Sequence, residues 1–319
     1  MGRYMVRRLL IAIPTLVVIA LVIYLMLATA PSNPLGALAN DDRISAETRI
    51  RIMQTYGLDK PPVERFYSWL TAVMRLDFGD SFMSHSPVMG LVLLALPNTL
   101  AVVGVAYVVG IVLAIPIGIL SATKRYSVYD MFATAFAYTG FTLPTFLTGT
   151  LFLMIFTFGL HWLPYAYDSN LQVRDLASLG QQIKQSVMPI MVLGLFDTAI
   201  LTRYVRAEML EHLPLDYVRT ARSKGLREQG VILGHVLRNS LIPVVTLIAL
   251  GIPTVFGGAI ITETIFRVPG IGQLLINSIQ TGDIPVAAAL LFIFSVLVVA
   301  FNLVADLLYA VLDPRIKYA

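Results

Sequence analysis

Long apolar stretches separated by short polar segments dominate the pattern of this chain. A helix rises about 1.5 Å per residue, so stretches of roughly 20 residues cross a hydrocarbon core about 30 Å thick. The pattern predicts six membrane-spanning helices, with Gly140 and Pro144 interrupting the third and Pro253 predicting a kink in the fifth. The predicted spans are Leu9–Ala30, Asn98–Leu120, Met131–Phe158, Val187–Tyr204, Leu241–Thr262 and Ile284–Leu312.

The stretch from residue 31 to residue 96 has a different pattern. It contains several prolines and many of the acidic residues, and its two predicted helices, Ser45–Tyr56 and Glu64–Leu76, are too short and polar to span a bilayer. We therefore divide the chain into three parts. These are an N-terminal anchor helix (1–30), an outer-face loop with short helices (31–96) and a core that carries the other five spans (97–319).

The composition agrees with a membrane protein. Of the 319 residues, 57% are hydrophobic and only 13% are charged, and the mean hydropathy is +0.78, whereas a soluble domain has about 25% charged residues. The expected fold class is therefore all-α, a polytopic membrane protein. The chain has no cysteine, which excludes disulfides, thiolate metal sites and cysteine nucleophiles.

The distribution of Lys and Arg predicts the orientation in the membrane. Basic residues are dense before the first span, around the segment between the fourth and fifth spans, and after the sixth, whereas the two short loops on the other side hold only Arg174, Lys184 and Arg267. Short loops rich in Lys and Arg stay on the cytoplasmic side. Both termini are therefore predicted to be cytoplasmic, and the localisation to be a cytoplasmic membrane.

The segment from Leu213 to Pro243 is the most charged part of the chain. Within it, Pro214–Lys224 is predicted as a short amphipathic helix with Asp216 near its positive end and Gly225 as the C-terminal cap. A solvated helix between two spans is well placed to dock on a soluble partner. The alternative is a basic loop that only sets the topology, and the residue pattern alone leaves both open.

No motif for catalysis is present in the sequence. Nothing fits the phosphate-binding pattern GxxxxGK[ST], so any ATP hydrolysis must occur in another chain. The four histidines are scattered and form no HExxH or similar set, so we predict neither a metal site nor a catalytic residue. The basic residues flank hydrophobic spans and are not interleaved with aromatic residues, which argues against nucleic-acid binding. We expect the chain not to be an enzyme.

Two acidic residues lie within predicted spans, Asp197 in the fourth and Asp306 in the sixth, and Asn302 lies one turn before Asp306 on the same face. Ionisable groups in a bilayer are costly, so they face a partner or an aqueous path. One interpretation is the polar lining of a translocation path. The other is a structural pair, for example Asp197 with Arg203 or Arg206, and for Asp306 we favour a structural role.

Several motifs occur in an order that resembles one known family. DYVRTARSKGL from Asp216, followed by HVLRNSLIPVV from His235, is similar to the cytoplasmic loop signature of ABC importer permeases, specifically the dipeptide, oligopeptide and nickel permease family. Arg219-Thr220-Ala221 stands where the general signature has Glu-Ala-Ala. Further similar motifs are RRLLIAIPTLVV, YGLDKP, LDFGDSF, LPNTL, IPIGILSA, ETIFRVPGIGQLL and LLYAVLDPRIKY.

This resemblance implies a type I importer fold and a set of partners. The chain would form half of a translocation path with a second, similar permease, two cytoplasmic ATPases that hold ATP and Mg²⁺, and an extracytoplasmic binding protein. The cofactors would belong to the ATPases and none to this chain. Peptides are the first cargo expected, and oligosaccharides or nickel chelates are alternatives.

The resemblance also implies that the segment 205–240 is the coupling loop. Its helix would sit in a cleft of one ATPase, and ATP-driven closure would move the attached spans. Tyr217 and Ala221, one turn apart, are predicted to form the docking face. The full set of predicted coupling residues is Asp216, Tyr217, Arg219, Thr220, Ala221, Lys224 and Gly225.

Three rival functions remain on the residues alone. A proton-coupled secondary transporter would use Asp197 or Asp306 as a relay and would show inverted repeats, which the two halves of the sequence do not display. A membrane-integral enzyme would need a reactive cluster. A non-transporting scaffold would bind an ATPase without coupling it to cargo.

Overall fold

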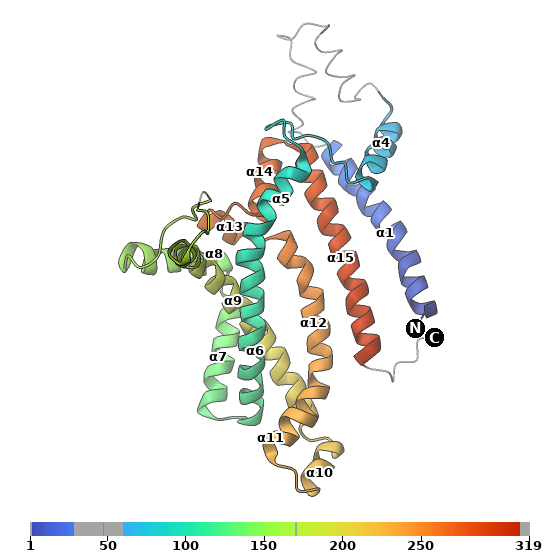
Figure 1. The fold of residues 1–319 in the computed structure, drawn as a ribbon. Helices are drawn as coiled ribbons and strands as arrows, with labels where there is room; N and C mark the ends of the chain where they lie inside the picture. The colour runs from blue at the N-terminus through green and yellow to red at the C-terminus, as the bar shows by residue number, and fades with distance from the viewer. Residues whose placement is uncertain (1, 29–46, 48–59, 170, 313–319) are drawn as a thin grey trace.

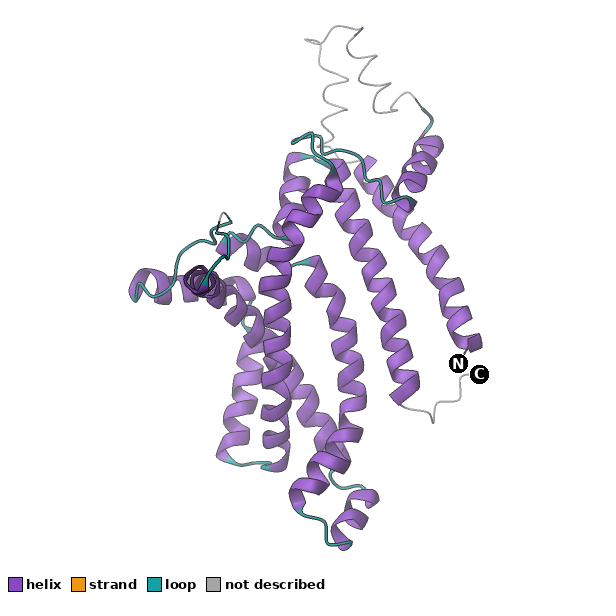
Figure 2. Cartoon of the chain, viewed as in Figure 1, coloured by secondary structure: helices purple, strands orange, loops and turns teal. Residues whose placement is uncertain are grey.

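A computed structural model describes residues 2–28, 47, 60–169 and 171–312. Within these ranges every element is helical apart from an isolated bridge between Asp80 and Pro87 (Figure 2). The expected helix over 45–56 lies outside the described residues except for Glu47. The α-helices are α1 Gly2–Ala28, α4 Pro62–Met74, α5 Val88–Thr99, α6 Val105–Thr123, α7 Val128–Thr142, α8 Thr145–Phe152, α9 Leu176–His212, α10 Asp216–Ser223, α11 Glu228–Val231, α12 Leu237–Gly257, α13 Ile260–Phe266, α14 Ile271–Thr281 and α15 Ile284–Leu312.

Three π-helical segments continue these α-helices, two of them between consecutive helices and one at the end of a helix. They are η1 Leu100–Gly104 between α5 and α6, η2 Leu153–Gly159 after α8, and η3 Ile232–Val236 between α11 and α12. Pro97, inside α5, has no backbone N–H to donate, and the wider π turn of η1 follows it at once. Each π segment therefore lies within or at the end of a longer helical run.

Four helical runs are long and apolar enough to cross a membrane: Val88–Thr123, Leu176–His212, Glu228–Gly257 and Ile284–Leu308. A fifth is reached if Val128–Thr142 and Thr145–Gly159, which meet at an angle of 102°, count as one broken span. In α1 only Leu10–Met26 is apolar, which is a shorter stretch. The described residues thus give four or five spans by length and composition, and a total of six would require α1, the first predicted span, to cross the membrane as well.

The second predicted span begins earlier than expected. The helix starts at Val88 and not at Asn98, so the residues before Asn98 that were assigned to the outer-face loop form its first turns. The sequence LPN suggests a boundary, because a proline usually lies near a helix start. Here the long apolar run from Val88 continues through Pro97, and packing of Val88, Val92 and Ala95 in a buried cluster favours the helix.

The fifth span and the loop after it were predicted incorrectly. The helix ends at Gly257 and not at Thr262, and Gly258 takes a positive φ of 75° that glycine adopts without strain. The residues between the predicted fifth and sixth spans, 263–283, are largely helical, because they contain the end of α13 and all of α14. The motif VPGIG is the turn between these two helices.

Close packing of α6 against α9 forms the centre of the bundle. A side chain added at Gly110 would meet the Cβ of Asp197 at 2.6 Å, and one at Gly118 would meet Val205 at 2.7 Å. These glycines therefore let the two helix backbones approach, as in other membrane helix pairs.

The bundle has two distinct ends (Figure 1). One end carries α10 and α11 and the turn between α6 and α7; we call it the α10 end. The opposite end carries α4 and α14, and we call it the α14 end. The start of α1 lies beside the last turns of α15, toward the α10 end, and Arg8 Nε lies 3.2 Å from Asp306 Oδ2.

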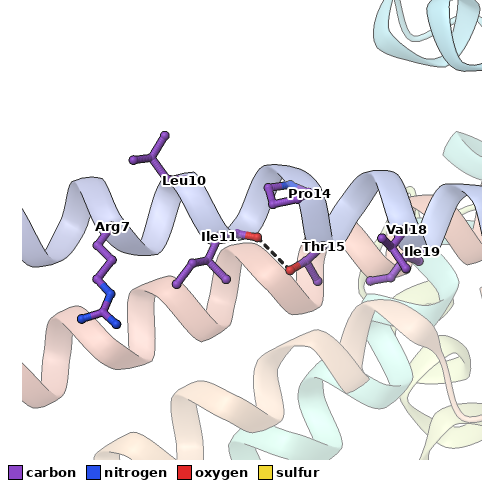
Figure 3. A pocket seen from close by; sticks show the side chains of 7 residues that line it. All are labelled: Arg7, Leu10, Ile11, Pro14, Thr15, Val18 and Ile19. Atoms are coloured by element: carbon purple, nitrogen blue, oxygen red, sulfur yellow. Dashed lines mark hydrogen bonds between the residues drawn. The ribbon is translucent and has the colours of Figure 1, made fainter.

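A groove lies along the first half of α1 (Figure 3). It is apolar except for Arg7 at one end and Thr15, whose hydroxyl donates to the carbonyl of Ile11 at 2.8 Å. Pro14 lies inside the helix beside this bond. The hydroxyl is thus satisfied within its own helix, as apolar surroundings require.

Candidate functional site

The predicted short helix is present as α10, Asp216–Ser223. It begins two residues after Pro214, with Asp216 in its first turn and Arg222 in its last, which suits the helix dipole. Gly225 follows with φ of +79° and nothing within 4 Å of where a Cβ would lie. Gly225 therefore provides the left-handed conformation that ends the helix, as predicted.

One face of α10 packs into the chain itself. Val218 is fully buried and Ala221 is 6% exposed, in a cluster with Ala122 of α6, Val205 and Met209 of α9, and residues of α11, η3 and α12. The prediction that Ala221 lies on a free docking face is therefore wrong. The small apolar residues of α10 anchor it to the ends of three membrane helices, because burying them there removes apolar surface from water.

The opposite face of α10 is exposed and charged. The side chain of Asp216 is 95% exposed and that of Arg219 is 72% exposed, and their charged atoms lie 3.5 Å apart. Thr220 and Lys224 are also exposed. An exposed pair of this kind contributes little to stability, so these side chains are free to contact another molecule.

Two tertiary contacts hold α10 in place. Arg222 Nη2 lies 2.7 Å from Glu228 Oε1, which closes the turn around Gly225. The hydroxyl of Tyr217 lies 3.1 Å from His212 Nδ1 at the end of α9. Tyr217 is half-buried, and burial raises the pKa of its hydroxyl. Tyr217 thus serves mainly as a link between α10 and α9, with only part of its ring on the surface.

Asp197 lies within α9, half-buried against Gly110 of α6. Within the described ranges it forms no ion pair, and the structural alternative from sequence is wrong for both partners. Arg206 binds Asp130 through two hydrogen bonds of 2.7 and 2.9 Å. Arg203 lies over the rings of Phe141 and Tyr204, 5.1 and 5.7 Å from their centres.

The other two predicted path residues are placed differently. Asp306 is paired with Arg8 of α1, which agrees with a structural role. Asn302, one turn earlier on α15, is exposed. The structure therefore does not bring Asp197 and Asp306 into one site.

The sequence reading missed a buried carboxylate at the α14 end. Glu263 is fully buried, and its carboxylate accepts from the hydroxyl of Thr99 at 2.9 Å and from the backbone N–H of Gln273 at 2.9 Å. Thr99 in turn accepts from the N–H of Ile271 at 2.8 Å. Ile271 and Gln273 lie in the first turn of α14, so Thr99 and Glu263 each accept from an N–H group that has no partner within that helix, and the carboxylate lies at the positive end of the helix dipole.

Two further polar contacts join distant segments. Asp283 accepts from the hydroxyl of Ser81 at 2.5 Å and from the N–H of Phe82 at 3.0 Å. Asp130, buried at the start of α7, also accepts from the hydroxyl of Ser121 on α6. In the sequence, the position of these acidic residues near the ends of predicted spans is the signal that could have identified them as functional or structural sites. Neither the hydrophobic pattern nor the charge distribution identifies the groups that donate hydrogen bonds to them.

Among the described residues, no group of three or more His, Asp or Glu side chains is arranged to hold a metal ion.

Comparison with known proteins places the chain in a family. Residues 114–318 match the model of the binding-protein-dependent transport system inner membrane component, and residues 1–103 match the model of the N-terminal part of such membrane components. The chain belongs to this family. The matched ranges include the segment 205–240 and the described membrane helices, apart from residues 104–113 of the run Val88–Thr123.

Two similar proteins have names that state their roles. The oligopeptide transport system permease protein AppB of Bacillus subtilis is 38% identical over 319 residues, and the match covers 100% of both chains. The dipeptide transport system permease protein DppB of Escherichia coli is 34% identical over 339 residues, covering 100% of this chain and 99% of that protein. As a member of this family the chain is a permease component of a transport system.

Proposed function

We propose that this chain is the permease subunit of an ATP-driven importer that takes up di- or oligopeptides delivered by an extracytoplasmic binding protein. Both named relatives belong to peptide transport systems. Oligosaccharides and nickel chelates are the cargo alternatives. In this proposal a second, similar permease completes the path, and two cytoplasmic ATPases bind ATP and Mg²⁺. The chain would lie in the cytoplasmic membrane of a prokaryote, with six spans and both termini cytoplasmic.

The observation that carries the proposal is the two-sided construction of α10. Its buried face shares one cluster with the ends of α6, α9 and α12. Its other face presents Asp216 and Arg219 to solvent. A protein that binds the exposed face and moves would therefore displace three membrane helices together, because packed helices transmit displacement as rigid bodies. This is the arrangement that coupling to a separate ATPase requires.

The translocation path would include Asp197. It lies where α6 and α9 meet, and none of the described basic residues pairs with it. A polar group in this position is costly in a dry bilayer and acceptable beside an aqueous path. Asn302 of α15, which is exposed, is a second polar group that the path would include. Asp306, paired with Arg8, has a structural role in this proposal.

The test uses substitutions on the exposed face of α10, since Ala221→Arg would disrupt the buried cluster. We expect Asp216→Arg with Arg219→Glu to leave the melting temperature within about 3 °C, since exposed pairs contribute under about 1 kcal/mol. The same variant should lose co-purification of the ATPases and peptide-stimulated ATP hydrolysis in proteoliposomes. Arg125→Glu, an exposed charge reversal on the turn between α6 and α7, is the matched control and should keep both activities.

Two results would reject the proposal. The first is a double variant that keeps full peptide-coupled ATP hydrolysis. The second is peptide uptake by the purified chain alone under a proton gradient and without an ATPase, which would favour the secondary transporter and make Asp197→Asn the next variant to study.

A further inference from the structure

A polar cavity lies at the start of α9, away from α10. Its volume is about 360 Å³, and it opens to solvent between the loop that precedes α9 and the first turns of α9 itself. Gln181, Lys184 and Gln185 line one side, and their spacing places them on one face of the helix. His161, Trp162 and Asp168 contribute from the loop. We call this cavity the loop–α9 pocket.

The wall of the pocket is held by specific hydrogen bonds. Gln185 is buried, and its side-chain oxygen accepts from the N–H of Asp168 at 2.8 Å. The adjacent residue, Tyr167, donates its N–H to the carbonyl of Phe266 at 3.1 Å, which ties the loop to α13. The backbone N–H of Trp162 donates to the carbonyl of Phe156 at 2.8 Å. The loop therefore holds its side chains in a formed pocket.

The chemistry of the lining differs from that of a larger cavity in the bundle. The cavity between α5, α12, α14 and α15, of about 530 Å³, is lined by aliphatic and aromatic side chains together with glycines and Thr254. The loop–α9 pocket combines a carboxylate, an ammonium, an imidazole and two carboxamides with the indole of Trp162. In a chain with only 13% charged residues, a pocket that holds both signs of charge is distinctive.

A pocket of this composition suits a small zwitterion with an apolar side chain. A carboxylate attracts a free ammonium, and Lys184 attracts a free carboxylate. Trp162, Leu163 and Leu171 supply apolar surface. The volume lies in the range of ligand pockets, about 300 to 1,000 Å³, and has room for a short peptide.

We infer that the loop–α9 pocket binds the termini of a short peptide, with Asp168 as the partner of the peptide ammonium and Lys184 as the partner of its carboxylate. This inference rests on the proposed function. It assigns to this chain an entry site on the side where the proposed topology has the binding protein arrive. Selectivity would then depend in part on the permease.

Trp162 provides the measurement. The chain has two tryptophans, so Trp69→Phe leaves Trp162 as its single fluorescent indole. The purified full chain with this substitution, in lipid nanodiscs, is titrated with leucyl-leucine and with N-acetyl-leucyl-leucine amide. We expect a saturable change in Trp162 emission with the free dipeptide and about tenfold weaker binding of the blocked form, equivalent to about 1.4 kcal/mol.

Two substitutions test the contributions of the two charged residues one at a time. With Asp168→Asn the free dipeptide and its N-acetyl form should bind equally, and with Lys184→Met the free dipeptide and its amide should bind equally. Both residues are exposed, so unchanged melting temperatures are expected. Asp80→Asn, exposed near the same end, and Lys124→Met, exposed at the other, are the matched controls and should titrate like the parent.

The inference fails if leucyl-leucine leaves Trp162 emission unchanged, if the blocked form binds equally well, or if only the binding protein changes the emission. Uptake by the complete transporter keeps this failure distinct from that of the proposed function. ATP-driven peptide uptake that is unaffected by Asp168→Asn and Lys184→Met would overturn the pocket and leave the proposed function intact.

Discussion

The two ends of the bundle use charged residues in opposite ways. At the α14 end, Glu263 and Asp283 are buried and accept hydrogen bonds from hydroxyls and backbone N–H groups of distant segments. At the α10 end, Asp216 and Arg219 are exposed and pair with each other. A buried charge is stable only when its hydrogen bonds are made, so it fixes its neighbours. An exposed charge fixes little and is available to a partner.

One contact shows that burial, and not the end of the bundle, makes this difference. Asp130 lies toward the α10 end, near the turn between α6 and α7, and is buried. Its two hydrogen bonds from Arg206 join α7 to α9. The α10 end therefore has a buried ionic contact beneath its exposed charged face. The predictions below test this comparison in order of expected effect.

The largest loss is expected from Glu263→Ala. It leaves the hydroxyl of Thr99 and the N–H of Gln273 buried without their acceptor, at about 1 to 3 kcal/mol for each group. We expect unfolding free energy to fall by about 3 kcal/mol or more, measured as a lower melting temperature in detergent. Thr264→Ala, on the exposed side of the same helix, is the control and should change it by less than about 1 kcal/mol. Equal effects would show that Glu263 does not hold the α14 end.

Asp130→Asn should have the next largest effect. It leaves Arg206 without its anionic partner, and breaking a buried pair costs about 3 to 5 kcal/mol when both groups are buried. Arg206 is partly exposed, so we expect about 2 kcal/mol, seen as a lower melting temperature. Joint replacement of Asp130 by Asn and Arg206 by Met should recover part of this loss. No recovery would mean that the hydrogen bond to Ser121 matters more than the ion pair.

The pH dependence of stability should differ between Glu263 and the exposed acids. Burial raises the pKa of Glu263 above its ordinary value of 4.5, against the opposing effect of its hydrogen bonds from Gln273 and Thr99. The folded state therefore favours the protonated form, and this contribution is complete at low pH and is lost as pH rises through the raised pKa. We expect Glu263→Gln to reduce the fall in melting temperature between about pH 5 and about pH 8. If the melting temperature of Glu263→Gln falls with pH as steeply as that of the parent protein, groups other than Glu263 cause the pH dependence.

The smallest effect is expected at the exposed pair of Arg222 and Glu228. Its side chains are 44% and 56% exposed, so Glu228→Gln should lower unfolding free energy by less than about 1 kcal/mol. The melting temperature is again the measurement, compared at low and high salt. A loss as large as that of Asp130→Asn would contradict the view that exposed charges at the α10 end contribute little to stability.

Local features of the fold were predictable because they depend on neighbouring residues. The bounds of α15 agree with the predicted sixth span, and Pro144 breaks the third span as expected. The short helix that ends before Gly225 was also anticipated, since its cap and charge pattern lie within a few residues. Where local signals conflicted, as at Pro97 inside a long apolar run, the helix start was misplaced.

The candidate site was predictable only in part, because exposure depends on packing between distant segments. The sequence places Ala221 on α10, and only the packing of α6, α9 and α12 shows that it faces inward. Arg206 was a reasonable partner for Asp197 on the same helix, but α7 brings Asp130 to it. The loop–α9 pocket likewise joins residues of a loop and of a helix face that no single motif contains.

The sequence by itself determined the helical class, most of the apolar runs, the position of the exposed charged helix and the family resemblance. These depend on hydrophobic periodicity, helix caps and motif order, which are properties of adjacent residues. Only the tertiary structure decided which carboxylates are buried, which arginine each one binds, and which face of α10 is free. These depend on the approach of elements far apart in the chain, and a buried charge is stable only where that approach supplies its hydrogen bonds.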